Sequence, residues 1–192
     1  MSELPLIAVT DSASCPRPLA EQIERLTKLT ELRPQAVILR AKSLDKAAYR
    51  TLALQAQQSC EATGIPLILH SDWQLARELG ISMLHLPLAL LRQISEYERA
   101  YFTWLSTSVH SVGEAQEAQE LGATVLIAGH IYTTQCKAGL APRGLGFLQA
   151  VCSTVSLPVY AIGGIGFDAA QHAELKANGA RGACVMSAYM RL

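Results

Sequence analysis

Eight short apolar segments recur along this chain, each separated from the next by a longer stretch of mixed polar and apolar residues. They cover residues 6–11, 36–42, 66–71, 82–87, 101–108, 123–130, 157–164 and 182–188. Their cores are almost continuously hydrophobic, which is typical of parallel strands buried on both faces. The pattern therefore predicts eight buried strands.

The stretches between these segments carry apolar residues at i, i+3 and i+4, the spacing of amphipathic helices. The clearest examples cover residues 18–29, 45–64, 111–122 and 167–179. Ser111 and Glu114 have the spacing of a capping box at the start of one helix. Glycines in the position of helix C-caps follow four helices, at Gly64, Gly80, Gly122 and Gly179.

Eight strands alternating with helices predict an α/β fold, a compact (β/α)8 TIM barrel in which residues 1–192 form a single domain. The alternative is an open, doubly wound parallel sheet. Only YMRL follows the eighth strand segment, so the closing C-terminal helix is short or absent. We expect the inner end of the barrel to be partly uncovered or covered by a partner subunit, which favours a homodimer.

The charge balance and the cysteines restrict the class of protein. The chain has 16 basic and 16 acidic residues, so no net charge attracts nucleic acid or anionic lipid. No apolar stretch approaches the ~20 residues of a membrane span, and the N-terminus lacks the features of a signal peptide. Five cysteines without a CxxC pair indicate free thiols. We expect a cytoplasmic protein that binds neither nucleic acid nor membrane.

Polar residues gather where the predicted strands end, which is where barrels of this kind build their sites. Any one of them could be an ordinary residue of the barrel rim, but the group as a whole predicts a functional site. Its members are Asp11, Arg40, Lys42, His70, His85, Ser108, His110, His130, Thr133, Thr134, Lys137, Gly163, Gly164 and Ser187.

The ends of the seventh and eighth strands predict a phosphate site. Gly163 and Gly164 precede a helix, so their backbone N–H groups and the helix N-terminus could approach a phosphate. Ser187 and its neighbouring amides could join them. A phosphorylated small molecule is the ligand we expect, although a Gly-Gly pair can also form a plain tight turn.

Three basic residues offer further anion contacts. Arg40 and Lys42 are two apart, so they face the same side of a strand. They bind an anion if that side is the barrel interior, and otherwise they form a solvated strand end. Lys137 lies in the polar segment 133–146, which is long enough to close over a ligand or is an ordinary surface loop.

Four histidines follow or end the predicted strands, but the sequence shows no convergence into a zinc site, and we expect no metal. A histidine acting as a general acid or base needs only one well-placed ring with a pKa near neutrality. His130 follows VLIAG directly and is the best-placed candidate.

The segments ILRAK, ILHSDWQLARELG, MLHLP, SVHSVGEAQEAQELGA, GHIYTTQCKAGLAPRGL, LPVYAIGGI and GACVMSA occur in an order that resembles the thiamine phosphate synthase superfamily. The resemblance spans roughly residues 5–190 and implies a (β/α)8 barrel that acts on a thiazole phosphate. It implies diphosphate contacts at Arg40 and Lys42. The other ligand-binding positions that it implies are Ser108, Thr133, Thr134, Lys137, Gly164, Val185, Met186 and Ser187.

The chain departs from the synthases at two places. They carry an Asn-Asp pair after strand three, where this chain has His70 and Ser71, with Asp72 one place late. After strand four they carry Gly-Gln and then Asp, where this chain has residues 87–90, PLAL. The resemblance implies that those aspartates hold Mg²⁺, which has little to bind without them. Their loss argues against diphosphate chemistry, unless Asp72 compensates.

The segment GHIYTTQCKAGLAPRG resembles the TenI branch, the thiazole tautomerases, and implies that His130 is the catalytic acid/base. The predicted reaction is aromatisation of a carboxythiazole phosphate by proton transfer, without a metal or organic cofactor. Gly163, Gly164 and the amides near Ser187 would hold the phosphate, and the substrate-binding set includes His70. The alternatives are a thiamine phosphate synthase, which joins a pyrimidine diphosphate to a thiazole phosphate, or a non-catalytic regulator that binds thiazole phosphate.

Overall fold

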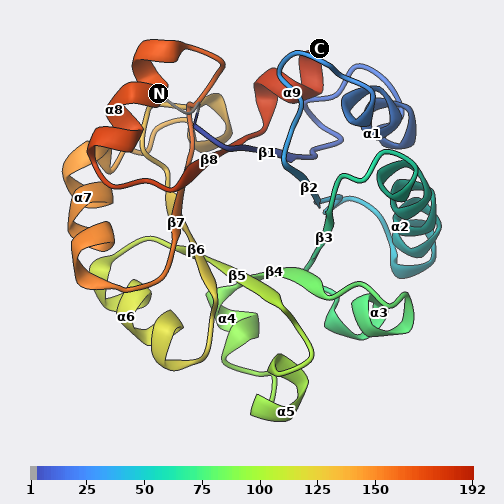
Figure 1. The fold of residues 1–192 in the computed structure, drawn as a ribbon, viewed down its shortest axis with the longest axis horizontal. Coiled ribbons are helices and arrows are strands. Elements are labelled where there is room, and N and C mark those ends of the chain that lie inside the picture. Colours follow the sequence, from blue (N-terminus) through green and yellow to red (C-terminus); the bar gives the residue numbers. More distant parts are fainter. Residues whose placement is uncertain (1–3) are drawn as a thin grey trace.

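The computed structural model describes residues 4–192 and shows a closed ring of eight parallel strands surrounded by helices (Figure 1). The strands pair in chain order, and β1 closes the ring against β8 with Leu6 opposite Ala183. The predicted (β/α)8 barrel is therefore confirmed. The open doubly wound sheet is wrong, because in that fold the first and last strands would not pair.

All eight predicted strands are present, each within a predicted apolar segment or overlapping its end. They are β1 (Leu6–Val9), β2 (Ala36–Leu39), β3 (Leu67–His70), β4 (Met83–Pro87), β5 (Trp104–Val109), β6 (Val125–Gly129), β7 (Val159–Ile162) and β8 (Gly182–Val185).

The four helices predicted most clearly are α1, α2, α6 and α8, whereas the short helices α4 and α5 have no counterpart in the prediction. The helices are α1 (Leu19–Thr27), α2 (Lys46–Glu61), α3 (Trp73–Glu78), α4 (Leu88–Leu91), α5 (Glu96–Arg99), α6 (Val112–Glu120), α7 (Gly144–Thr154), α8 (Ala169–Ala177) and α9 (Ser187–Arg191), with a 3-10 turn, η1 (Gln135–Lys137). The loop predicted over residues 133–146 ends earlier than expected, because α7 begins at Gly144.

The alternation of side chains along each strand divides the core into two layers. In β2, Ile38 belongs to the cluster that fills the barrel, whereas Val37 and Leu39 belong to the layer between the strands and the helices. Branched side chains suit this position because they pack well on a pleated surface. The same alternation, continued beyond β2, places Arg40 and Lys42 on the inner side of the barrel mouth.

Polar side chains cap several helices at the end of the barrel where the strands finish. Asp45 accepts a hydrogen bond from the Ala48 N–H at 2.8 Å at the start of α2. Asp72 accepts one from the Leu75 N–H at 2.9 Å at the start of α3. Since each helix follows its strand directly, these caps surround the barrel mouth.

The predicted capping features are present, with one change of partner. The Ser111 hydroxyl accepts a hydrogen bond from the Glu114 N–H at 3.1 Å, as in a capping box. The Glu114 carboxylate, however, accepts from the His110 N–H at 2.6 Å and not from the Ser111 N–H. The left-handed conformation expected of the C-cap glycines is found at Gly64, Gly80, Gly122 and Gly179.

The helix after β8 is the predicted stub, α9, with five residues. Tyr189 and Met190 are fully buried, and the ring of Tyr189 packs edge-on against Phe167, with ring centroids 4.9 Å apart. Gln22 of α1 donates a hydrogen bond to the Tyr189 carbonyl at 2.6 Å. The short helix thus packs against α1 and the segment before α8, and the expectation that the inner end of the barrel is partly uncovered stays a prediction.

Two further sequence predictions bear on the fold. Within residues 4–192, no helix has both the length and the apolar character required to cross a membrane. The cysteines are all free thiols, as predicted, and two of them, Cys60 and Cys184, are buried.

Candidate functional site

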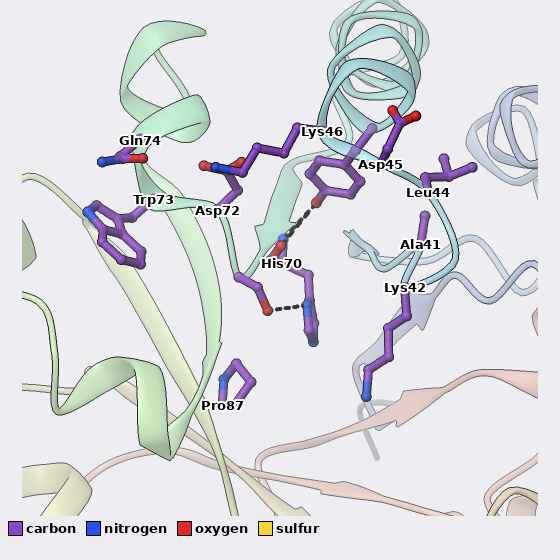
Figure 2. Close-up of a pocket in the computed structure, with 12 residues that line it drawn as sticks. Ala41, Lys42, Leu44, Asp45, Lys46, His70, Asp72, Trp73, Gln74 and Pro87 are labelled. Atoms are coloured by element: carbon purple, nitrogen blue, oxygen red, sulfur yellow. Dashed lines mark hydrogen bonds between the residues drawn. The ribbon is translucent and has the colours of Figure 1, made fainter.

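A cavity of about 390 Å³ opens at the mouth of the barrel above β2, β3 and β4 (Figure 2). Two of the sequence-predicted site residues, Lys42 and His70, line it. Its other walls are residues that the prediction did not include as site residues, namely Ala41, Leu44, Asp45, Lys46, Tyr49, Ser71, Asp72, Trp73, Gln74 and Pro87. Lys46 and Tyr49 were detectable in principle, because the first helical turn after strand two must face the same end of the barrel.

One hydroxyl group joins the two strand ends beneath this cavity. Tyr49 projects from α2, and its hydroxyl donates to the Leu39 carbonyl at 2.8 Å and accepts from the His70 N–H at 3.1 Å. Burial raises the pKa of Tyr49 to about 12, so the phenol stays protonated and remains a donor. This hydroxyl bridges the ends of β2 and β3, which are paired along their length.

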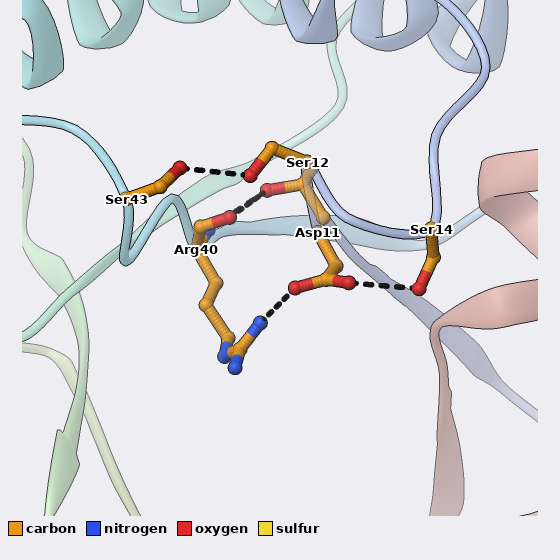
Figure 3. A network of polar contacts seen from close by, with 6 residues as sticks. Asp11, Ser12, Ser14, Arg40 and Ser43 are labelled. Carbon is orange, nitrogen blue, oxygen red and sulfur yellow. Dashed lines mark hydrogen bonds and ion pairs between the residues drawn. The ribbon is translucent and has the colours of Figure 1, made fainter. Parts of the chain in front are cut away.

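Arg40 lies beside the cavity in a network that connects β1 with β2 (Figure 3). Its guanidinium forms an ion pair with Asp11, whose other carboxylate oxygen accepts from the Ser14 hydroxyl at 2.7 Å. The Thr10 hydroxyl donates to the Arg40 carbonyl and accepts from the Arg40 N–H, both at 2.8 Å. The charge of Arg40 is thus held in place and partly balanced.

His70 and His85 lie on neighbouring strands, opposite each other in register, with ring centroids 5.3 Å apart. Burial, together with the charges of Arg40 and Lys42, lowers the pKa of His70 to about 4. Burial lowers the pKa of His85 to about 3, with a contribution from His70. Both rings are therefore neutral at pH 7.

Both ring nitrogens of His85 contact serine hydroxyl groups of β5. His85 Nδ1 lies 3.0 Å from the Ser106 hydroxyl, which also lies 3.3 Å from the Leu84 carbonyl, and His85 Nε2 lies 3.0 Å from the Ser108 hydroxyl. In a neutral imidazole one nitrogen donates and the other accepts, and a hydroxyl group can match either role. These two contacts hold the His85 ring against β5.

A second group of predicted residues follows β6 and lies outside this cavity. Gly129 ends the strand, and its carbonyl accepts from His110 Nδ1 at 2.7 Å and from Arg143 Nε at 3.2 Å. His130 comes next, and its Nε2 atom is buried without a hydrogen-bond partner within residues 4–192. The structure does not bring His130 together with the residues that line the cavity of Figure 2.

Gly163 and Gly164 have positive φ angles of 102° and 70°, and both face the segment that follows β6. A Cβ atom on Gly163 would lie 2.3 Å from Cβ of His130, and one on Gly164 would lie 2.5 Å from the Thr133 carbonyl oxygen. The close approach of two protein segments thus requires glycine at both positions. The sequence-based prediction explained the two glycines by the approach of a phosphate, whereas the structure explains them by the packing of the segment after β6.

The remaining predicted residues lie around the rim. Thr133 and Lys137 are exposed, and Thr134 is half-buried just before η1. Val185 is buried at the end of β8, Met186 packs against the barrel interior, and Ser187 begins α9. Their roles as ligand contacts stay predictions.

The donor groups at the mouth do not fit the Mg²⁺ site that the resemblance implied. In the part of the chain that the structure describes, no group of three or more His, Cys, Asp or Glu side chains could hold a metal ion. Asp72 lines the cavity, and one of its two carboxylate oxygens caps α3. After β4 the chain folds into α4, where Leu88 and Leu91 are buried and offer no oxygen ligand.

A family model described as thiamine monophosphate synthase matches residues 6–189. This chain belongs to that family. The thiamine-phosphate synthase of Listeria monocytogenes serotype 4b is 36% identical over 157 residues, covering 79% of this chain and 72% of the relative. The thiamine-phosphate synthase of Syntrophomonas wolfei is 29% identical over 196 residues, covering 98% of this chain and 90% of the relative.

A solved structure of the family shares the fold. The thiamine phosphate pyrophosphorylase from Pyrococcus furiosus superimposes with a TM-score of 0.78 over 97% of this chain and 87% of that one. Its sequence is 24% identical, so the likeness supports the barrel and not a particular reaction.

The relatives correct the functional prediction. They are named thiamine-phosphate synthases, so the prediction that this chain is a thiazole tautomerase, an isomerase, is wrong. The role of His130 as a catalytic acid/base stays a prediction. The reasoning failed where it equated the loss of two metal ligands with the loss of diphosphate chemistry. Basic side chains also neutralise phosphoryl oxygens, and the mouth of this barrel supplies them.

Proposed function

We propose that this protein is a thiamine-phosphate synthase, which joins a pyrimidine diphosphate to a thiazole phosphate. The bond between the pyrimidine methylene carbon and the diphosphate breaks, and its electron pair leaves on the diphosphate. The thiazole nitrogen then forms the new bond to that carbon with its own lone pair. The names of the relatives support this proposal, and the observation that carries it is the basic side chain of Lys42 beside the neutral ring of His70 in one cavity (Figure 2).

The basic residues account for departure of the diphosphate. Negative charge grows on the diphosphate as its bond to carbon lengthens, and fixed cations stabilise that charge most in the transition state. Lys42 lines the cavity, and Arg40 is positioned beside it by Asp11. Arg40 uses one nitrogen for this ion pair, which leaves further N–H donors of the guanidinium for a phosphate oxygen.

The uncharged polar residues suit the pyrimidine ring. A developing carbocation next to the ring is poorly served by a protonated histidine, and both His70 and His85 are neutral at pH 7. The Ser108 hydroxyl, in contact with His85 Nε2 near the end of β5, can donate to or accept from a polar substituent of the ring. We assign these residues to positioning of the ring.

The phosphate of the thiazole belongs, in this proposal, to the opposite side of the mouth. The backbone between β7 and α8, including Gly163 and Gly164, precedes a helix whose N-terminus carries partial positive charge. Val185, Met186 and Ser187 follow β8 next to it. Thr133, Thr134 and Lys137 lie in the loop after β6 and complete the proposed ligand-binding set.

The test is direct synthesis. Purified protein is mixed with the pyrimidine diphosphate and the thiazole phosphate, and both thiamine phosphate and released diphosphate are measured over time. Equal amounts of the two products are expected, and Lys42→Met should lower the rate about tenfold or more, as loss of a charged contact does.

A lack of any product, with or without Mg²⁺, would overturn the proposal. The second candidate is a non-catalytic protein that binds thiazole phosphate, and the specific observation in its favour is the lack of a ready metal site within residues 4–192. It predicts binding of thiazole phosphate without turnover. Titration calorimetry on the same preparation measures that binding.

A further inference from the structure

The loop between β7 and α8 is held by the side chains of two neighbouring residues of α8. The carboxamide of Gln171 makes two hydrogen bonds to the loop: Oε1 accepts from the Gly166 N–H at 2.9 Å, and Nε2 donates to the Gly164 carbonyl at 3.0 Å. His172 Nε2 lies 2.8 Å from the Gly166 carbonyl. Because a carbonyl only accepts, this ring nitrogen carries the proton and donates it to the bond. Both side chains are half-buried.

A second set of contacts to the loop comes from the segment after β6. The Gly163 carbonyl accepts from the Tyr132 N–H at 3.0 Å, next to the bond from the Ile131 N–H to the Ile162 carbonyl at 2.9 Å. The Tyr132 hydroxyl donates to the carboxylate of Glu174, on α8, at 3.0 Å. Side chains of α8 therefore hold the loop after β7 directly and bond the segment that packs against it.

The contacts from α8 determine the direction of amide groups in the loop. The peptides of this loop are trans, so each carbonyl points opposite to the N–H of the next residue. The bond from Gln171 to the Gly164 carbonyl therefore directs the Ile165 N–H away from the Gln171 side chain. His172 has the same effect on the Phe167 N–H, because it holds the carbonyl of the preceding residue.

The amide groups directed in this way are free to bind a ligand. The N–H groups of Gly164, Ile165 and Phe167 donate to no residue from 4 to 192. The Gly166 N–H, in contrast, is occupied by Gln171. Free backbone N–H groups just before a helix suit the oxygens of a phosphate, and the partial positive charge of the helix N-terminus adds to them.

We infer that Gln171 and His172 are positioning residues for the phosphate of the thiazole substrate. They act through the backbone that they hold, so that the free amides keep one direction before the ligand arrives. The inference deepens the proposed function and rests on it for the identity of the ligand. Loss of either side chain should lower the affinity for thiazole phosphate. Affinity for the pyrimidine diphosphate, which the proposal places at the cavity above β2 and β3, should stay the same.

Titration calorimetry with thiazole phosphate and, separately, with the pyrimidine diphosphate tests the inference. Gln171→Met removes both contacts of the carboxamide and keeps the length of the side chain, and His172→Leu removes the ring donor. His172→Gln is the conservative variant, because its amide can still donate to the Gly166 carbonyl. Gln57→Met is the matched control, since the Gln57 amide donates to the Leu79 carbonyl at 3.2 Å, at the C-terminal end of α3.

The expected result is that Gln171→Met and His172→Leu each weaken binding of thiazole phosphate roughly tenfold, as loss of a hydrogen bond to a charged group does. Binding of the pyrimidine diphosphate changes by less than about twofold. His172→Gln and Gln57→Met bind both compounds as the wild type does. In the synthase assay, KM for thiazole phosphate rises by the same factor, whereas KM for the pyrimidine diphosphate and kcat stay unchanged. Thermal melts establish that all variants are folded at the assay temperature.

Three results would overturn the inference. The first is binding of thiazole phosphate that Gln171→Met and His172→Leu leave unchanged. The second is an equal loss of affinity for both substrates, which would mark a general structural role, and the third is a wild type that does not bind thiazole phosphate. Product formation with unchanged binding in the two variants refutes only the positioning role. Binding that depends on Gln171 and His172, without any product, refutes only the synthase.

Discussion

Replacement of Gly163 by alanine tests why a glycine stands at the end of β7. The new Cβ would lie 2.3 Å from Cβ and 2.7 Å from Cα of His130. Neither atom is the end of a flexible side chain, so relief requires the backbone of one segment to move. The φ angle of 102° adds strain, because side chains disfavour it.

The two costs can be added. A positive φ costs an alanine about 1–2 kcal/mol, and overpacking of a tight contact costs about 1–3 kcal/mol, so the free energy of unfolding should fall by roughly 2–5 kcal/mol. For a chain of this size that corresponds to a decrease of roughly 5–15 °C in Tm. Urea unfolding, followed by circular dichroism, measures the loss.

Gly64→Ala is the matched control. Gly64 also has a positive φ, 69°, but no other atom lies within 4 Å of the point that an added Cβ would occupy, so only the conformational cost of about 1 kcal/mol applies. The reasoning is refuted if the two variants lose equal stability. In that case Gly163 would serve only the approach of a ligand, and its substitution would weaken phosphate binding without a larger loss of stability.

Three further predictions concern the cavity. The pKa of a histidine in the unfolded chain is near 6.5, whereas the pKa values of His70 and His85 in the folded protein are about 4 and about 3. Below pH 6.5 the unfolded state therefore binds more protons than the folded state, so the free energy of unfolding should fall as the pH is lowered. The expected loss is on the order of 2 kcal/mol per ring between pH 7 and pH 5. Urea midpoints at the two pH values measure this, and a flat profile would contradict the neutral assignment. Tyr49→Phe removes the hydroxyl that joins β2 and β3 and should cost about 1–2 kcal/mol of unfolding free energy, whereas an unchanged midpoint would show that the contact contributes nothing. Asp72→Asn keeps an N-cap acceptor, so stability should change by less than about 0.5 kcal/mol and the rate of synthesis only a few-fold. A loss of rate of roughly a hundredfold would instead identify Asp72 as a metal ligand.

The fold could be predicted because its signal repeats. Each strand is a short apolar segment with polar or glycine-containing flanks, and eight repeats of one unit leave few alternatives to a barrel. The segment 88–91, LALL, shows the limit of this approach. Four apolar residues directly after a strand have no visible helical period, so α4 could not be distinguished from a continuation of β4.

The site was predictable only in part, for a geometric reason. Alternation along one strand was sufficient to place Arg40 and Lys42 on the same face. The contact between His70 and His85 depends on the register of β3 against β4, and the contact between His85 and Ser106 depends on that of β4 against β5. Register is set by packing across the whole barrel and is not encoded in the composition of either strand.

The reaction could not be obtained from two missing residues. The positions after β3 and β4 lack the expected carboxylates, but Lys42 and Lys46, the latter on α2, place basic side chains at the same cavity. A prediction made from individual positions cannot weigh groups that come together only in space. The relatives supplied the correction because their similarity to this chain is measured over most of its length and not at two positions.

The backbone at Ser71 has a consequence for redesign of this barrel. Its φ of 70° is left-handed, a conformation in which aspartate and asparagine are more common than serine. Ser71→Asp would therefore introduce a carboxylate beside His70 and Asp72 without new strain in the main chain. The substitution would thus place a second carboxylate next to Asp72 at the cavity, with loss of the contact between the Ser71 hydroxyl and His70 Nδ1, and a dependence on divalent cations could be engineered from there.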